Sequence, residues 1–193
     1  MAFLTRQQLE DIGFKSVGSK VYISDKVSIY GAQNISIGNN VRIDDFVVLS
    51  AGDDGIEIGN YIHIAVFSSL IGAGKIILED FCNISSRVSI YSSSDDYSGC
   101  FMSNPMVSNI FTNVTKAPVT LCKHVIVGCG SVILPGVKLH EGCAIGALSL
   151  INKSIEKWAI YAGVPATKIK DRSNRCLKLE TEFVALESIK SGN

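Results

Sequence analysis

Three histidines are the chain's best candidates for proton transfer near neutral pH: His63, His124 and His140. His63 lies in the segment Tyr61-Ile-His-Ile-Ala, directly before an apolar residue of a repeat, so its side chain should point outward. His124 and His140 fall at turn or side positions of the same repeat, and we interpret both as solvated surface residues. The sequence therefore favours His63 as a general base. A hydrogen-bonded histidine at a subunit interface is the alternative.

Asp95 and Asp96 form a second chemically suggestive group, in a stretch rich in serine. A carboxylate hydrogen-bonded to one ring nitrogen of a histidine fixes its tautomer and stabilises the protonated ring, and either aspartate could supply it to His63. By itself an aspartate is a poor base for a hydroxyl, because its unperturbed pKa is about 3.9. The alternative is that both residues form turns or accept hydrogen bonds from a sugar.

A strict six-residue repeat of apolar side chains governs the elements that must hold these residues. A helix repeats about every 3.6 residues and a strand about every 2, so this period belongs to neither alone. It predicts a chain wound around a triangular prism, with one short strand on each side. The fifth residue of each repeat is small or β-branched, so positions one and five are both expected to point inward. The longest unbroken run of position-one residues is Leu121, Val127, Ile133, Leu139, Ile145 and Ile151.

Breaks in the repeat all fall after a third strand, so the inserted segments are expected at one corner of the prism. The largest is the loop 91–118. Long loops on a rigid scaffold often carry binding and catalytic residues. Because this corner differs from that of His63, a contact between His63 and Asp95 or Asp96 is expected to cross a subunit boundary.

Both ends of the chain carry helical signals. Thr5 and Gln8 match the capping box of a short helix that begins after Thr5. Gly13 can end this helix. Apolar residues at helical spacing predict a second helix over about 175–190. We therefore predict an all-β fold, a parallel β-helix of hexapeptide repeats, with a short N-terminal helix and a C-terminal helix. As one domain, 1–193, it would comprise a helical cap 1–14, the β-helix 15–156 with the loop 91–118, and a C-terminal segment 157–193.

Composition argues against several classes of partner. The 193 residues carry 18 basic and 18 acidic side chains, which gives no reason to expect nucleic acid or an anionic membrane. No segment is apolar for long enough to span a bilayer. The six cysteines include no CxxC pair and no metal-ligand spacing, so no metal is expected. Cys82 and Cys143 fall at inward positions, which favours buried thiols and a reduced, cytoplasmic setting.

Two stretches resemble a known family. The first is Val127-Gly-Cys-Gly-Ser-Val-Ile-Leu-Pro-Gly-Val-Lys-Leu, followed by Ala144-Ile-Gly-Ala, and the second is Tyr161-Ala-Gly-Val-Pro-Ala-Thr-Lys-Ile-Lys. Together they resemble the hexapeptide-repeat acyltransferases, in particular the branch of galactoside, maltose and xenobiotic acetyltransferases. The resemblance implies a left-handed parallel β-helix, a homotrimer, and acetyl-CoA in the groove between neighbouring subunits.

The resemblance also bears on the catalytic residue. In the resembled branch a histidine of the long loop acts as general base on the acceptor hydroxyl. This loop has no histidine, and Asp95 and Asp96 stand in its place. The segment around His63 matches one that lines the acceptor pocket in the resembled enzymes, which adds to the case for His63. Whether His63 or a loop aspartate is the base stays open.

A donor site is expected along the last coils. Small residues, among them Gly128 and Gly130, would keep these coils slim enough for an extended pantetheine arm. The resemblance implies that Gly146, Ala147, Asn152, Lys153 and Lys170 line the CoA groove, and Cys129 is included with them. Lys153, Lys168 and Lys170 suit the nucleotide phosphates. The alternative is that the glycines are purely steric and the lysines only solvated.

The expected function is an acetyl-CoA-dependent acetyltransferase. It would act on a hydroxyl or amino group of a sugar or nucleotide-linked sugar, in the synthesis of a surface polysaccharide. One alternative is O-acetylation of a drug or other xenobiotic, with Phe101, Met102, Met106 and Phe111 wrapping an apolar acceptor. A zinc enzyme on the same fold would need three converging histidines. A non-catalytic scaffold of stacked coils is the last alternative.

Overall fold

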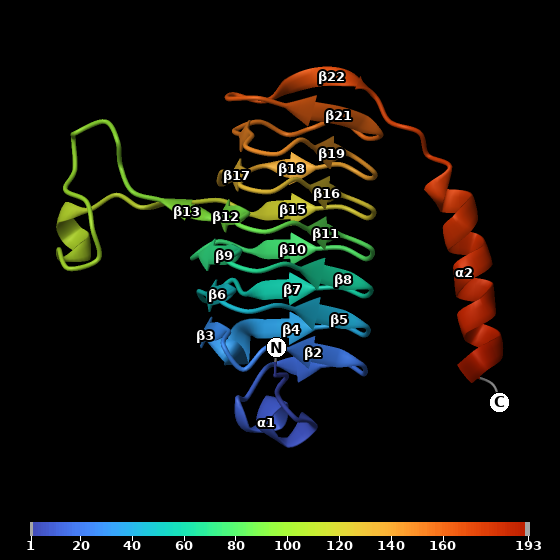
Figure 1. Ribbon diagram of the computed structural model, residues 1–193. Coiled ribbons are helices and arrows are strands. Elements are labelled where there is room, and N and C mark those ends of the chain that lie inside the picture. The colour runs from blue at the N-terminus through green and yellow to red at the C-terminus, as the bar shows by residue number, and fades with distance from the viewer. Residues whose placement is uncertain (1, 192–193) are drawn as a thin grey trace.

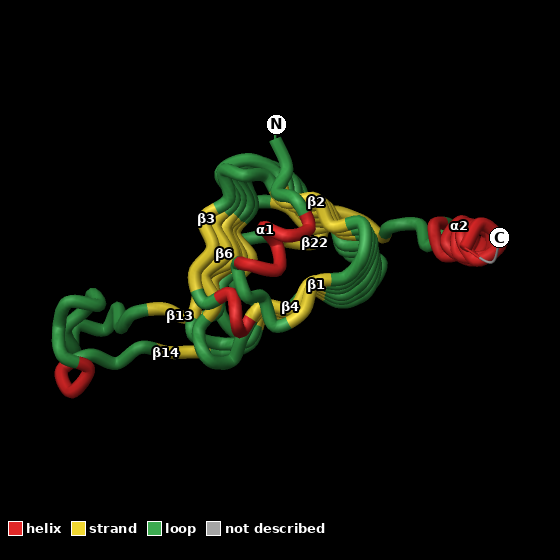
Figure 2. The backbone as a smooth tube through the Cα atoms, turned by 90° about the horizontal axis from the view of Figure 1, so that it is seen from below, coloured by secondary structure: helices red, strands yellow, loops and turns green. Residues whose placement is uncertain are grey.

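The computed structural model describes residues 2–191, with backbone alone at 190 and 191; residues 1 and 192–193 of the predicted end segments lie outside the described residues. The chain winds upward around a prism with three flat faces, each a sheet of short strands (Figures 1 and 2). The first face contains β1 (Ser16–Val17), β4 (Ile35–Ile37), β7 (Ile56–Ile58), β10 (Ile76–Leu78), β15 (Val119–Leu121) and β18 (Lys138–Leu139).

The other two faces repeat this plan. The second face contains β2 (Val21–Ile23), β5 (Val41–Ile43), β8 (Ile62–Ile64), β11 (Asn83–Ile84), β16 (Ile126–Val127), β19 (Ala144–Ile145), β21 (Ala159–Ala162) and β22 (Thr167–Asp171). The third face contains β3 (Ser28–Tyr30), β6 (Val48–Ala51), β9 (Ser69–Gly72), β12 (Ser89–Tyr91), β17 (Val132–Ile133) and β20 (Leu150–Ile151). Neighbouring strands within each face are parallel, except β21 and β22, which are antiparallel. The predicted β-helix is confirmed.

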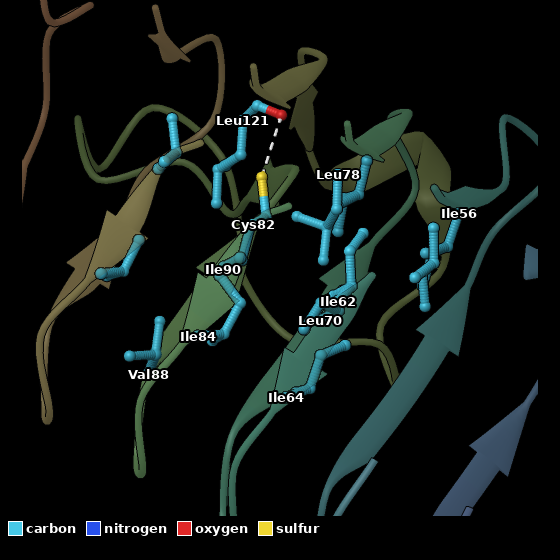
Figure 3. Packing of buried hydrophobic residues seen from close by; sticks show 14 of the residues in the cluster. Ile56, Ile62, Ile64, Leu70, Leu78, Cys82, Ile84, Val88, Ile90 and Leu121 are labelled. Carbon is cyan, nitrogen blue, oxygen red and sulfur yellow. Dashed lines mark hydrogen bonds between the residues drawn. The ribbon is translucent and has the colours of Figure 1, made fainter. Parts of the chain in front are cut away.

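The core fills the bore of the prism, as the repeat predicts. Position-one side chains such as Ile64 and Ile84 are fully buried, and so are position-five side chains such as Val88 (Figure 3). Only the first coil departs from this, since Val17, Val27 and Ile29 are partly exposed at the end of the prism. A side chain between two inward positions of one strand must therefore point outward.

The thiols predicted to be inward are buried. Cys82 donates its S–H to the Leu121 carbonyl oxygen at 3.6 Å (Figure 3). Burial raises the pKa of Cys82 well above its ordinary value, and burial raises that of Cys143 to about 12. Both thiols stay protonated near neutral pH.

The three corners of the prism differ in what they carry. The first corner, which leads from the first face to the second, and the second corner, which leads from the second to the third, are tight turns with a residue in the left-handed region, for example Phe81 (φ +62°) and Phe67 (φ +61°). The third corner, which leads back to the first face, carries every insertion, including η1 (Ala32–Asn34), as predicted. Its largest insertion is an arm over residues 93–118, based on paired strands β13 (Ser93–Ser94) and β14 (Thr115–Lys116) and containing η2 (Asn109–Phe111).

Both predicted helices are present. Helix α1 (Arg6–Asp11) has the predicted capping box of Thr5 and Gln8, and its Leu9 closes the lower end of the core. Helix α2 (Cys176–Ser191) runs beside the prism on the side opposite the arm (Figure 1). Strands β21 and β22 lie in the segment predicted to follow the β-helix, where no six-residue period marks them. Among the described residues, no helix combines the length and hydropathy that crossing a bilayer requires.

Candidate functional site

His63 is held by a carboxylate of its own chain. It is the outward residue of β8 between buried Ile62 and Ile64, and its side chain is 42% exposed. Its Nε2 lies 2.9 Å from Oδ2 of Asp44, which follows β5 one coil below. Within one chain, the carboxylate that contacts His63 is therefore Asp44. The contact predicted for Asp95 or Asp96 crosses a subunit boundary and stays a prediction.

Asp44 is buried, and each of its carboxylate oxygens forms a hydrogen bond. Its side chain is 8% exposed, and its Oδ1 accepts a hydrogen bond from Arg42 Nε at 2.7 Å. Burial acts to raise the pKa of Asp44, but hydrogen bonds from His63 and Arg42 outweigh it and hold this pKa below its ordinary value. Asp44 is thus ionised at neutral pH. Sequence reasoning missed it, although matching His63 to Arg42 one coil below would have shown the proximity.

The second corner brings together the predicted donor residues of the upper coils. Gly128 and Cys129 follow β16, and Gly146 and Ala147 follow β19 directly above. Cys129 and Ala147 are exposed, and the Leu148 amide donates to the Cys129 carbonyl at 2.8 Å. These four residues form a narrow strip of small side chains and backbone along one edge of the prism.

Coil stacking by itself requires two of these glycines. A Cβ added to Gly128 would lie 2.5 Å from the Ala147 nitrogen, and one added to Gly146 would lie 2.8 Å from the Ala162 Cβ. Real Cβ atoms essentially never approach other atoms so closely. The steric explanation of these glycines is therefore sufficient, and exposed Ala147 is the position that reports on a ligand.

His63 and the donor strip lie on one side of the molecule. On the second face the outward residues above His63 are Asn83, Ile126 and Ala144, in consecutive coils. Coils are spaced about 4.8 Å apart, so the strand that leads into Gly146 lies roughly 14 Å above His63. An extended thiol arm entering along the strip would point down this column toward His63.

The remaining predicted donor residues lie elsewhere. Asn152 and Lys153 follow β20 at the third corner, and Lys170 lies on β22 at the top of the second face. All three are exposed. Lys168 instead bonds to Glu156 at 3.2 Å and to Asp171 at 2.9 Å. A groove that uses the second corner together with Lys153 would draw on two corners of the prism.

The predicted aspartates separate at the base of the arm. Asp96 Oδ2 accepts hydrogen bonds from Ser98 Oγ at 2.8 Å and from the Gly99 amide at 3.2 Å, which makes it a turn former. Asp95 is exposed and lines a hollow of about 420 Å³ with Tyr91 and Val132. This hollow is on the third face, whereas His63 is on the second.

His124 corrects a prediction, because it is not a solvated histidine. Its side chain is 10% exposed, and its Nε2 lies 2.7 Å from Oε2 of Glu180 on α2. Its ring stacks on Phe81 at 5.1 Å, and Phe81 stacks on Tyr61 at 5.0 Å. The prediction failed because α2, which covers this corner, is remote in sequence. His140 is exposed, as predicted.

No family model matches the chain, but individual proteins do. It is 58% identical over 183 residues to the dTDP-4-amino-4,6-dideoxy-D-glucose acyltransferase of Escherichia coli. This alignment covers 95% of each of the two chains. AntD, an N-acyltransferase from Bacillus cereus solved with dTDP-4-amino-4,6-dideoxyglucose and coenzyme A, superposes with a TM-score of 0.91 at 46% identity. That match covers 95% of this chain and 97% of AntD. AntD has also been solved with dTDP and 3-hydroxybutyryl-CoA (TM-score 0.91, 45% identity, 96% and 98% covered).

A left-handed β-helix with this similarity defines a class. The chain belongs to the hexapeptide-repeat acyltransferases, as its motifs predict. It is an acyltransferase that takes its acyl group from a coenzyme A thioester. Within the family, its identity to the acyltransferase of a nucleotide-linked amino sugar is 58%, whereas its identity to the galactoside O-acetyltransferase of Escherichia coli is 25% over 170 residues.

Proposed function

We propose that the protein transfers an acyl group from acyl-CoA to the 4-amino group of dTDP-4-amino-4,6-dideoxyglucose or a closely related nucleotide sugar. The observation that carries this proposal is the 58% identity to an enzyme of that activity over 95% of both chains. It favours the amine over the hydroxyl, which the sequence patterns left open. The product would serve a surface polysaccharide, and the buried thiols fit a cytoplasmic setting.

In the proposed reaction His63 is the general base. The acceptor nitrogen attacks the thioester carbonyl carbon, the new C–N bond forms, and the C–S bond breaks. His63 takes the proton that the nitrogen gives up and passes it to the departing sulfur, so that CoA leaves as a thiol and His63 ends neutral. An amine needs less base assistance than a hydroxyl, so the contribution of His63 would lie toward the lower part of the roughly 10²–10⁴-fold range of positioned bases.

The donor would lie along the second corner. Exposed Ala147 and Cys129 leave room for the pantetheine arm beside backbone groups of the last coils. Lys153 and Lys170 suit the phosphates, and among the described residues neither forms an ion pair. The column from Ala144 down to His63 would lead the thioester to the acceptor.

We propose a homotrimer in which each site uses two copies. The arm carries large apolar side chains that its own chain leaves exposed, including Met106 (92%) and Ile110 (76%). The arm leaves the third corner and points away from the prism (Figure 2), so Asp95 would meet His63 of a neighbouring copy. Burial of the arm between copies would supply the missing apolar contacts.

Asp95 would bind the acceptor, and Asp96 would shape the arm. AntD has been solved with a serine replaced and with an aspartate replaced, and these two positions are ten residues apart. The same spacing joins Ser85 to Asp95 and Ser86 to Asp96 here. Both serines lie at the second corner, one coil above that of His63. This supports a site in which an arm aspartate and a corner serine face the same substrate.

The test is release of CoA from acetyl-CoA with a panel of acceptors. We expect turnover with dTDP-4-amino-4,6-dideoxyglucose and little with a galactoside or chloramphenicol. Turnover restricted to chloramphenicol or to the galactoside would refute the proposal. Sedimentation should show a trimer, and a stable monomer of full activity would refute the shared site.

A further inference from the structure

The contact between Asp44 and His63 fixes which ring nitrogen can act. An ionised carboxylate only accepts hydrogen bonds, so the His63 Nε2 that lies 2.9 Å from Asp44 Oδ2 must carry a hydrogen. In the neutral ring the lone pair is then on Nδ1. Among the described residues Nδ1 has no hydrogen-bond partner. The structure therefore leaves Nδ1 as the basic atom.

Arg42 locks this arrangement from the other side. Its guanidinium has donors only, and its Nε occupies Asp44 Oδ1 at 2.7 Å. Each carboxylate oxygen thus has one fixed donor. Because the Asp44 side chain is only 8% exposed, few waters can replace either partner. Rotation of the carboxylate would break both contacts.

We propose that Asp44, oriented by Arg42, is the positioning residue that holds His63 in the tautomer with a basic Nδ1. This inference rests on the proposed role of His63 as the base. It replaces the orienting role predicted for Asp95 or Asp96, and leaves those residues to the acceptor. Asp44 touches neither substrate, and acts only through the ring.

The chemistry of an asparagine at this position gives a sharp test. In Asp44→Asn, the carbonyl oxygen would face Arg42, because Arg42 cannot accept a hydrogen bond. The amide NH₂ would then face His63 Nε2 and force the proton onto Nδ1, the wrong tautomer. In Asp44→Ala the ring has no partner and samples both tautomers. We therefore expect the isosteric variant to be the worse enzyme.

The experiment measures kcat and the KM of each substrate, with dTDP-4-amino-4,6-dideoxyglucose and acetyl-CoA varied in turn while the other is saturating. We expect kcat to fall roughly 100-fold in Asp44→Asn and roughly 10-fold in Asp44→Ala, with KM for acetyl-CoA unchanged. Adding Arg42→Met to Asp44→Asn lets the amide turn its oxygen to Nε2, and should recover part of the loss. Asp45→Asn is the matched control, because Asp45 bonds to Ser24 and Lys26 instead and should retain wild-type kcat.

Two results would overturn the inference. One is an Asp44→Asn enzyme as active as, or more active than, Asp44→Ala, with unfolding temperatures of both near wild type. The other is no recovery on adding Arg42→Met. Failure of the proposed function is distinguishable, because it would appear as an inactive wild-type protein or as full activity of His63→Ala.

Discussion

His63 and His124 each form a hydrogen bond through Nε2 to a carboxylate, but the surroundings of the two histidine–carboxylate pairs differ. The His63 side chain is 42% exposed on the second face, with Asp44 buried beneath it. His124 is 10% exposed, stacked on Phe81 and covered by Glu180 of α2. A histidine–carboxylate contact is therefore no catalytic signature by itself. Access to the ring separates a candidate base from a structural contact.

The His124 contact fastens α2 to the prism. Glu180 also pairs with Lys123 at 2.5 Å, and Phe183 of the same helix meets the ring of Tyr61 edge-on at 5.2 Å. These contacts line the first corner, whereas Gly128, Cys129, Gly146 and Ala147 of the predicted donor site line the second. The attachment of α2 and these four predicted donor residues therefore lie at different corners of one scaffold.

The largest effect should separate the two histidines. His63→Ala should lower kcat by a factor toward the lower part of the roughly 10²–10⁴-fold range, since a positioned base is removed and the acceptor is an amine, while CoA still binds along the upper coils. His124→Ala is the matched control and should keep kcat near wild type. Steady-state CoA release at neutral pH measures both. A larger loss in His124→Ala than in His63→Ala would reverse the comparison.

A bulky side chain should separate the two corners. CoA at about 100 times its Kd should stabilise the native protein by about 2.7 kcal/mol, seen as a rise in Tm. Ala147→Trp should abolish this rise by filling the donor strip. Glu141→Trp, placed six residues earlier at the first corner, should leave it intact. An equal CoA-induced rise in both variants would show that the groove lies elsewhere.

A smaller effect should come from the contact that fastens α2. Glu180→Gln removes a charge that is 16% exposed and pairs with His124 and Lys123. Loss of such a charge-assisted bond costs about 1.5 kcal/mol, or a roughly tenfold faster amide exchange in α2. Glu182→Gln, an exposed change on the same helix, is the control. Unchanged exchange with reduced kcat would give the first corner a functional role.

The smallest effect should be a weaker attachment of α2 at acidic pH. Burial acts to raise the pKa of Glu180, but hydrogen bonds from Lys123 and His124 hold it below its ordinary value. A lowered folded pKa contributes stability above the unfolded value of about 4.3, and this is lost as pH falls through the folded value. The rate of amide hydrogen exchange in α2, corrected for the pH dependence of exchange in an unfolded chain, should therefore rise below about pH 4.3. Glu180→Gln should show no such rise.

The repeat made the coils predictable, while contacts between distant segments escaped it. The six-residue period predicted that Ile62 and Ile64 point inward and His63 outward, because every strand places the same repeat positions in the core. It also placed the arm, since insertions interrupt the period. Asp44 and Glu180 were missed, because the period does not show which side chains of different coils, or of a helix beyond the repeats, will meet. The αL corner residues such as Phe81 also carry no local signal of their stacking partners.

The most direct test is a crystal structure with CoA and dTDP-4-amino-4,6-dideoxyglucose bound. The decisive measurement is the distance from His63 Nδ1 to the amino nitrogen of the sugar. We predict hydrogen-bond distance, about 2.6–3.2 Å or one bridging water, with the pantetheine arm beside Ala147. An amino nitrogen bonded to Asp95 alone, with His63 beyond the reach of one water, would contradict His63 as the base.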